Sequence, residues 1–128
     1  MYTSIRLIFS FFFLLSLLTL SSCYYDKEEI LYPGTACDVN NVTYSVTVTG
    51  ILSSHCYSCH STANAASIGG GISLDSYTKL LPYVTNGKLM GSINHAGGYS
   101  PMPKSATKLN SCDIQKIQAW VTAGAPNN

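Results

Sequence analysis

The chain has 128 residues, of which 10% are charged, and a formal net charge of +1. A chain of this length holds one small domain, and so small a net charge does not predict a nucleic acid as partner. From residue 42 onward, five lysines face two aspartates. This excess could orient a docking face toward an acidic protein, although solvated lysines would have the same composition.

The first 22 residues have the order of a secretory signal peptide. Residues 1–6 carry one positive charge, residues 7–20 are almost wholly apolar but short for a membrane span, and Ser21-Ser22-Cys23 follows. Small residues before a cysteine resemble the lipobox of bacterial lipoproteins. We therefore predict that Cys23 becomes the lipid-modified N-terminus, which fixes the protein to a membrane surface. The alternative is an ordinary signal peptide with a coincidental cysteine.

Residues 23–36 are predicted to be a tether between this lipid and a domain at 37–128. They mix aromatic and charged residues without a period and include the turn signal Pro33-Gly34. The Lys27-Glu28-Glu29 run resembles the export signal of surface lipoproteins in Bacteroidetes, but an ordinary charged linker would look the same. We expect the protein in the cell envelope, at the periplasmic face or the outer-membrane surface.

Two patterns compete in residues 40–54. Valine and tyrosine alternate with threonine and serine over residues 42–49, which is typical of a strand. Apolar residues also recur at helical spacing from Tyr44 to Leu52. We expect a helix, because this segment leads directly into the cysteine motif that follows it.

In that motif, Cys56 and Cys59 are separated by two residues, and His60 follows at once. This C-x-x-C-H spacing is the attachment signature of a c-type haem. One short turn puts both thiols on the same side of the backbone, where they can add across the two vinyl groups of a haem. Cys56 and Cys59 would become thioethers, and the adjoining His60 imidazole would be the proximal iron ligand.

Three other interpretations of the motif place different demands on the chain. A thioredoxin-like C-x-x-C needs a flanking βαβ pattern, and none is visible in the sequence. A structural zinc site needs four ligands, usually as two pairs, whereas Cys37 and Cys112 stand alone. A chance occurrence of the motif is the third interpretation, and the remaining sequence argues against it.

Export also affects how the other cysteines are interpreted. If Cys23 carries lipid and Cys56 and Cys59 carry haem, Cys37 and Cys112 are left as a pair in an oxidising compartment. A disulfide between them would close a loop of about 75 residues and contribute roughly 3 to 4 kcal/mol. Two buried free thiols are the alternative.

A loop and a short helix are predicted after the motif. Residues 61–73 are small and flexible, with three consecutive glycines, and should pass close to a ligand or another backbone. Residues 75–81 are predicted to form a helix that is capped by Ser73 or Asp75 and stopped by Pro82.

The next segment is predicted to be mostly loop. Asn86-Gly87 predicts a turn, and residues 88–93 are long enough for one further helical turn. Residues 94–106 are dominated by glycine, proline and serine, so we expect a long loop that holds Met102 between two prolines.

The last helix is the best defined element of the sequence. Asn110 or Ser111 can cap it, Asp113 lies in its first turn, and Gly124 and Pro126 end it. Its apolar face comprises Ile114, Ile117, Trp120 and Val121. We expect Trp120 to anchor this helix against the first one, with Gly50 as the point of close approach.

A haem held by one histidine has an open position unless a second side chain fills it. The candidates are Met102, His95, Met90 and His55, but His55 adjoins the first haem cysteine and is poorly placed. We favour Met102, because the prolines on both sides restrict its loop and help a thioether stay on iron. His95 and an open site are the alternatives, and core packing is the other common role of such a methionine.

These motifs together resemble a small class I c-type cytochrome, in a version found in exported lipoproteins of Bacteroidetes-like bacteria. The resemblance covers residues 37–128 and rests on the C-x-x-C-H motif, Ser100-Pro101-Met102-Pro103 and the last helix. It implies an all-α cytochrome c fold of three to four short helices and long loops around one covalently bound haem c. The threonines and valines of the first helix depart from the family pattern.

The resemblance implies an electron carrier and not an enzyme. Such a protein would be a membrane-anchored monomer that passes single electrons between redox protein partners, its potential raised by an axial methionine. The alternative is a haem enzyme, or a gas- or peroxide-binding haem protein, with an open distal site. A thiol–disulfide oxidoreductase or zinc module is a third class and would need free cysteines.

Overall fold

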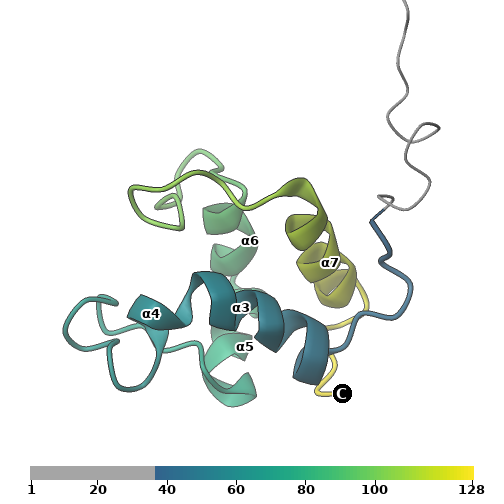
Figure 1. Cartoon of the computed structure of the whole chain (residues 1–128), viewed down its shortest axis with the longest axis horizontal. Coiled ribbons are helices and arrows are strands. Elements are labelled where there is room, and N and C mark those ends of the chain that lie inside the picture. The colour runs from purple at the N-terminus through teal and green to yellow at the C-terminus, as the bar shows by residue number, and fades with distance from the viewer. Residues whose placement is uncertain (1–36) are drawn as a thin grey trace, which may run out of the picture. The chain divides into compact units, whose positions relative to one another are not determined.

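Helices provide all the regular secondary structure of residues 37–128, which are the residues that the computed structural model describes (Figure 1). In chain order they are the π-helical turn η1 (Tyr44–Val48), α3 (Thr49–His55), α4 (Tyr57–His60), α5 (Tyr77–Thr85), α6 (Lys88–Ile93) and α7 (Ser111–Thr122). The all-α prediction is confirmed for this part of the chain. The predicted signal peptide, Cys23 and the tether lie outside the described residues.

The first helical segment, η1 with α3, confirms the helix predicted for residues 40–54 but begins only at Tyr44. Thr43 is still extended, and Asn128 accepts hydrogen bonds from the N–H groups of Tyr44 (2.9 Å) and Ser45 (2.8 Å). A residue far along the chain thus satisfies donors that a new helix leaves free.

Among the described helices, none is long and apolar enough to cross a membrane.

Burial explains why the alternating pattern of this segment does not make a strand. Tyr44 and Val48, one helical turn apart, are buried, whereas Val46 between them is 74% exposed. The threonines fit the helix through local hydrogen bonds, as when the Thr49 hydroxyl donates to the Ser45 carbonyl at 2.7 Å. Helical periodicity therefore decides which apolar side chains enter the core.

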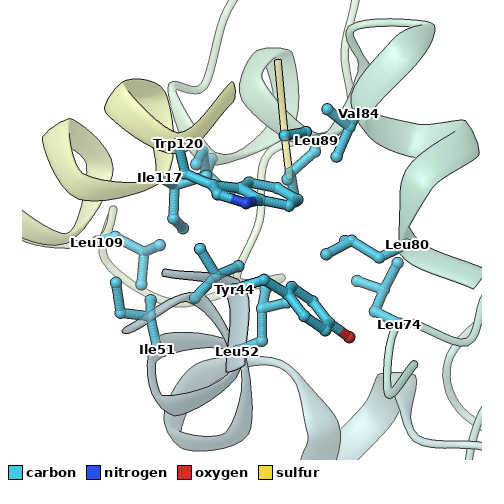
Figure 2. Close-up of a cluster of buried hydrophobic side chains, with 13 residues drawn as sticks. Tyr44, Ile51, Leu52, Leu74, Leu80, Val84, Leu89, Leu109, Ile117 and Trp120 are labelled. Carbon is cyan, nitrogen blue, oxygen red and sulfur yellow. The ribbon is translucent and has the colours of Figure 1, made fainter. Parts of the chain in front are cut away.

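Trp120 is the anchor between the last helix and the first, as predicted (Figure 2). Its ring stacks on Tyr44 with centroids 5.8 Å apart, and its indole N–H donates to the Pro126 carbonyl at 2.9 Å. The position predicted for close approach is wrong. Gly50 is exposed, with nothing within 4 Å of an added Cβ, whereas α7 packs against η1, where Trp120 stacks on Tyr44.

Helix α5 also differs from the prediction. It runs from Tyr77 to Thr85 and contains Pro82, which was expected to stop it near residue 81. Buried Leu80 and Val84 lie on either side of the proline and hold both halves of the helix against the core. Neither Ser73 nor Asp75 caps this helix, because the Asp75 carboxylate accepts hydrogen bonds from the preceding loop.

Helices α6 and α7 agree with the sequence interpretation. Gly87, at a φ of 75°, forms the turn before α6. The side chain of Asn110 caps α7 by accepting from the Asp113 N–H at 2.8 Å, and Gly124, at a φ of 90°, follows its end.

A disulfide joins Cys37 to Cys112 in the first turn of α7, with Cα atoms 5.3 Å apart. The sequence left open either a disulfide or two buried free thiols for these cysteines, and the structure has the disulfide. It connects the start of the described chain to the helix that packs on η1.

Candidate cofactor site

A cavity of about 340 Å³ is lined by residues of the cysteine motif, α6 and the loop at residues 94–106. Cys56, His60 and Met102 all line it. These are three of the four residues that the sequence assigns to a haem, and the fourth, Cys59, lies outside the lining. Apolar side chains of Ile72, Leu74, Leu89 and Ile93 form much of the remaining wall.

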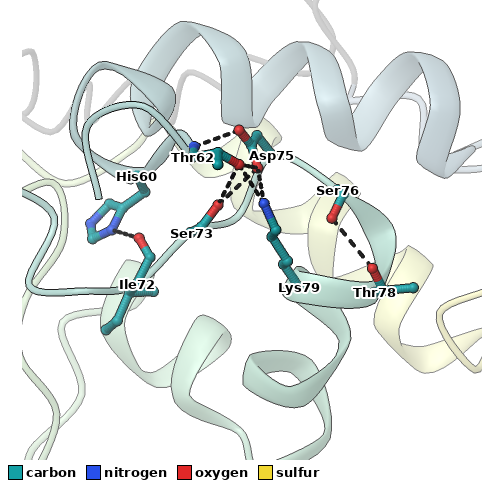
Figure 3. A network of polar contacts seen from close by, with 8 residues as sticks. All are labelled: His60, Thr62, Ile72, Ser73, Asp75, Ser76, Thr78 and Lys79. Carbon is teal, nitrogen blue, oxygen red and sulfur yellow. Dashed lines mark hydrogen bonds and ion pairs between the residues drawn. The ribbon is translucent and has the colours of Figure 1, made fainter. Parts of the chain in front are cut away.

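The orientation of the His60 imidazole is fixed by a backbone carbonyl. Its Nδ1 lies 2.9 Å from the carbonyl oxygen of Ile72 (Figure 3). A carbonyl can only accept, so Nδ1 carries the proton and Nε2 of the neutral ring keeps its lone pair. Histidine ligands of metals commonly have such a second hydrogen bond, which sets the tautomer and raises the basicity of the ligating nitrogen.

The loop that carries this carbonyl packs closely on the cysteine motif. The Leu74 N–H donates to the His60 carbonyl at 2.7 Å. A Cβ added to Gly69 would lie 2.3 Å from the Cys59 carbonyl oxygen, so only glycine fits at this point. The predicted approach of the glycine loop to another backbone is confirmed at this residue.

Cys56 and Cys59 lie one helical turn apart as free thiols. The Cys56 carbonyl accepts from the N–H groups of Cys59 (3.1 Å) and His60 (2.8 Å), which folds the motif into a single turn. Burial, with a smaller contribution from neighbouring Cys59, raises the pKa of the Cys56 thiol to about 11. Thiol–disulfide oxidoreductases instead use a thiol of lowered pKa.

Of the four side chains predicted as candidates for a second iron ligand, Met102 alone lines the cavity. Its N–H donates to the Ser92 carbonyl at 3.0 Å, which fastens the loop to α6. Exposed His95 does not line the cavity, and its Nε2–H donates to the Met102 carbonyl at 3.0 Å. Met90 packs against the hydrophobic core, and His55 lies 3.5 Å from Asp113 as an ion pair when protonated.

Sequence reasoning missed a polar edge of the cavity, formed by Lys88, Ser92 and Tyr99. The Tyr99 ring lies on α6, because a Cβ at Gly91 would be 2.5 Å from the ring and one at Gly87 would be 3.7 Å from its hydroxyl. The tyrosine hydroxyl therefore lies beside the turn where Lys88 begins α6. Two glycines four residues apart were the available signal for this packing.

Within residues 37–128, no three histidine, cysteine or acidic side chains gather in a group that could hold a metal ion by themselves. Comparisons of the chain with protein-family models, with curated proteins and with solved structures find no match. The interpretation of the site therefore depends on its own chemistry.

Proposed function

We propose that this protein is a monohaem c-type cytochrome that carries single electrons between redox proteins of the cell envelope. One observation carries the proposal: two parts of the chain that are far apart in sequence, the cysteine motif with Cys56 and His60 and the loop with Met102, line the same cavity. The helices and long loops of residues 37–128 would then be a small cytochrome c fold.

The donor set fits a haem c. His60 offers an imidazole with a free Nε2, Met102 offers a thioether, and Cys56 and Cys59 offer two free thiols one turn apart. His60 and Met102 would be the protein ligands of the iron, and the cysteines would form the covalent links. When bound, haem supplies an iron that gains and loses one electron.

The polar edge of the cavity, formed by Lys88, Ser92 and Tyr99, suits the carboxylate groups of a haem. Haem has two propionate groups, which are anionic at neutral pH. Lys88 has no ion-pair partner among the described residues, and the Tyr99 hydroxyl lies at the same end of α6. These two side chains would bind the propionates, while Leu89 and Ile93 would provide an apolar wall for the rest of the haem.

Electron transfer is favoured over haem catalysis because of Met102. If Met102 and His60 both ligate the iron, no ready position would remain for peroxide or a gas, and the thioether would favour ferrous iron. The alternative, an enzyme or gas-binding protein, needs a distal ligand that is absent or easily displaced. Substitution of Met102 therefore decides between the two functions.

The direct test is to express the full chain together with a cytochrome c maturation system and to purify it from membranes. We expect its mass to include one haem, and its visible spectrum to change reversibly as one electron per protein is added. The proposal would be overturned by a folded, exported protein without haem, in which both motif thiols react with an alkylating reagent.

Replacing Cys23 with alanine is expected to move the protein from the membrane to the soluble fraction. The visible spectrum should not change, because the predicted lipid would lie outside the domain at 37–128. Fractionation followed by immunoblotting measures the distribution, with an alanine substitution at exposed Ser53 as the control. Membrane association that survives the loss of Cys23 would show that another segment anchors the protein.

A further inference from the structure

The hydrogen bond between His60 and Ile72 depends on a loop with little apolar packing of its own. Most of residues 61–71 are exposed, and Gly70 and Gly71 have positive φ angles. The carbonyl that orients the imidazole thus lies at the end of a segment with a flexible composition. Its position must be fixed by the contacts where the loop closes.

Asp75 makes the side-chain contacts there (Figure 3), in addition to the backbone hydrogen bond from the Leu74 N–H to the His60 carbonyl. One carboxylate oxygen accepts from the Thr62 N–H at 2.5 Å, and the other accepts from the hydroxyls of Thr62 and Ser73, each at 2.8 Å. Thr62 follows His60 by two residues, and Ser73 directly follows Ile72. The carboxylate therefore joins the two chain segments that carry the donor and the acceptor of the imidazole bond.

We propose that Asp75 is a positioning residue for His60, holding the Ile72 carbonyl on Nδ1 and so setting the imidazole for its role as a ligand. The inference rests on the proposed function in one respect, namely that His60 ligates iron. Asp75 would act only through the loop, since its hydrogen bonds go to Thr62 and Ser73 and not to the ring.

A carboxylate suits this role better than other side chains. It accepts three hydrogen bonds from the loop, whereas an asparagine amide has one accepting oxygen and would direct an NH₂ group at a donor. The loop hydrogen bonds, led by the Thr62 N–H, hold the pKa of Asp75 well below its usual range. Lys79 lies 3.4 Å from the same carboxylate and also bonds to the Thr62 hydroxyl.

The expected consequence for the ligand follows from its second hydrogen bond. A carbonyl that accepts from Nδ1–H raises the basicity of Nε2, which stabilises the more positively charged, oxidised iron. If the loop loosens, this stabilisation weakens and the reduction potential rises. The proton on Nδ1 also becomes more accessible to solvent.

The test is Asp75→Asn in the full-length, haem-loaded protein. NMR should show exchange of the His60 Nδ1 proton with solvent accelerated roughly tenfold, as expected for loss of one well-supported hydrogen bond. Protein-film voltammetry should show a higher midpoint potential. The paired substitution Thr62→Val with Ser73→Ala removes hydroxyl partners of the carboxylate and should change both readouts in the same direction.

Ser76→Ala is the matched control. It removes an exposed contact between the hydroxyls of Ser76 and Thr78, 3.4 Å apart, which does not involve the loop. Both readouts should stay at the parental values. If Asp75→Asn lowers the melting temperature but leaves the proton exchange and the potential unchanged, Asp75 only stabilises the fold and the inference is wrong.

The two proposals fail in different ways. A parent protein without haem overturns the proposed function, while proton exchange at His60 in the folded domain still tests whether Asp75 holds the imidazole. If the parent contains haem but the His60 Nδ1 proton exchanges equally fast in the parent and in Asp75→Asn, the proposed function stands. The proposed role of Asp75 is then wrong.

Discussion

Replacing His60, Cys56 or Cys59 with alanine is expected to leave most of the exported protein without haem and degraded. The cavity of about 340 Å³ would then lack its occupant. At about 24 cal/mol per Å³, an empty cavity of this size would cost about 8 kcal/mol, an upper limit because water can enter. A small domain is stable by only about 5–15 kcal/mol, so cooperative folding should be lost. Haem-stained gels and urea unfolding measure both effects.

His55→Ala is the matched control for these substitutions. His55 directly precedes the motif but is exposed, does not line the cavity and pairs with Asp113 on the surface. Exposed pairs contribute at most about 1 kcal/mol, so this variant should load haem normally. A folded, protease-resistant protein lacking Cys56, Cys59 and His60 together would contradict the haem proposal.

Replacing Met102 with alanine is expected to change the iron more than the fold. The oxidised parent should show a weak near-infrared band from sulfur-to-iron charge transfer, and the variant should lose it. Added imidazole or cyanide should then bind. The midpoint potential should fall by an amount on the order of 100 mV, because the thioether that favours ferrous iron is gone. Spectroscopy and voltammetry measure these effects.

Met90→Ala separates a ligand from a packing residue. Met90 packs against the core and does not line the cavity, so its loss should lower stability and leave the near-infrared band intact. The opposite result would make Met90 the ligand. If His95→Ala opens the iron and neither methionine matters, the protein is a bis-histidine cytochrome of lower potential.

The parts of the structure that could be predicted from sequence are those with local causes. Helix α7 has its cap, its first-turn aspartate and its terminating glycine within a few residues of each other, so its bounds follow from short-range rules. The turn from Cys56 to His60 is equally local. For the first helix, local composition favoured a strand, and burial of Tyr44 against Trp120 is the contact that decides for a helix.

The parts that sequence reasoning missed depend on contacts between distant residues. Pro82 was expected to end α5, but core packing of Leu80 and Val84 carries the helix past it. Gly50 looked like a contact point because glycine has no side chain to keep two helices apart, yet Gly50 is exposed and α7 packs against η1. Asp75 looked like a helix cap, and only the folded loop shows that its partners are Thr62 and Ser73.

The disulfide between Cys37 and Cys112 also determines what a cut in the chain would do. Every residue that lines the cavity falls between these two cysteines in the sequence, so all of them belong to one covalent ring. A protease that cleaves a single peptide bond in the exposed loop at residues 61–73 or at 94–106 would open this ring without releasing a fragment. The segments bearing His60 and Met102 would remain joined through the sulfur bridge, and a nicked molecule could keep both in place.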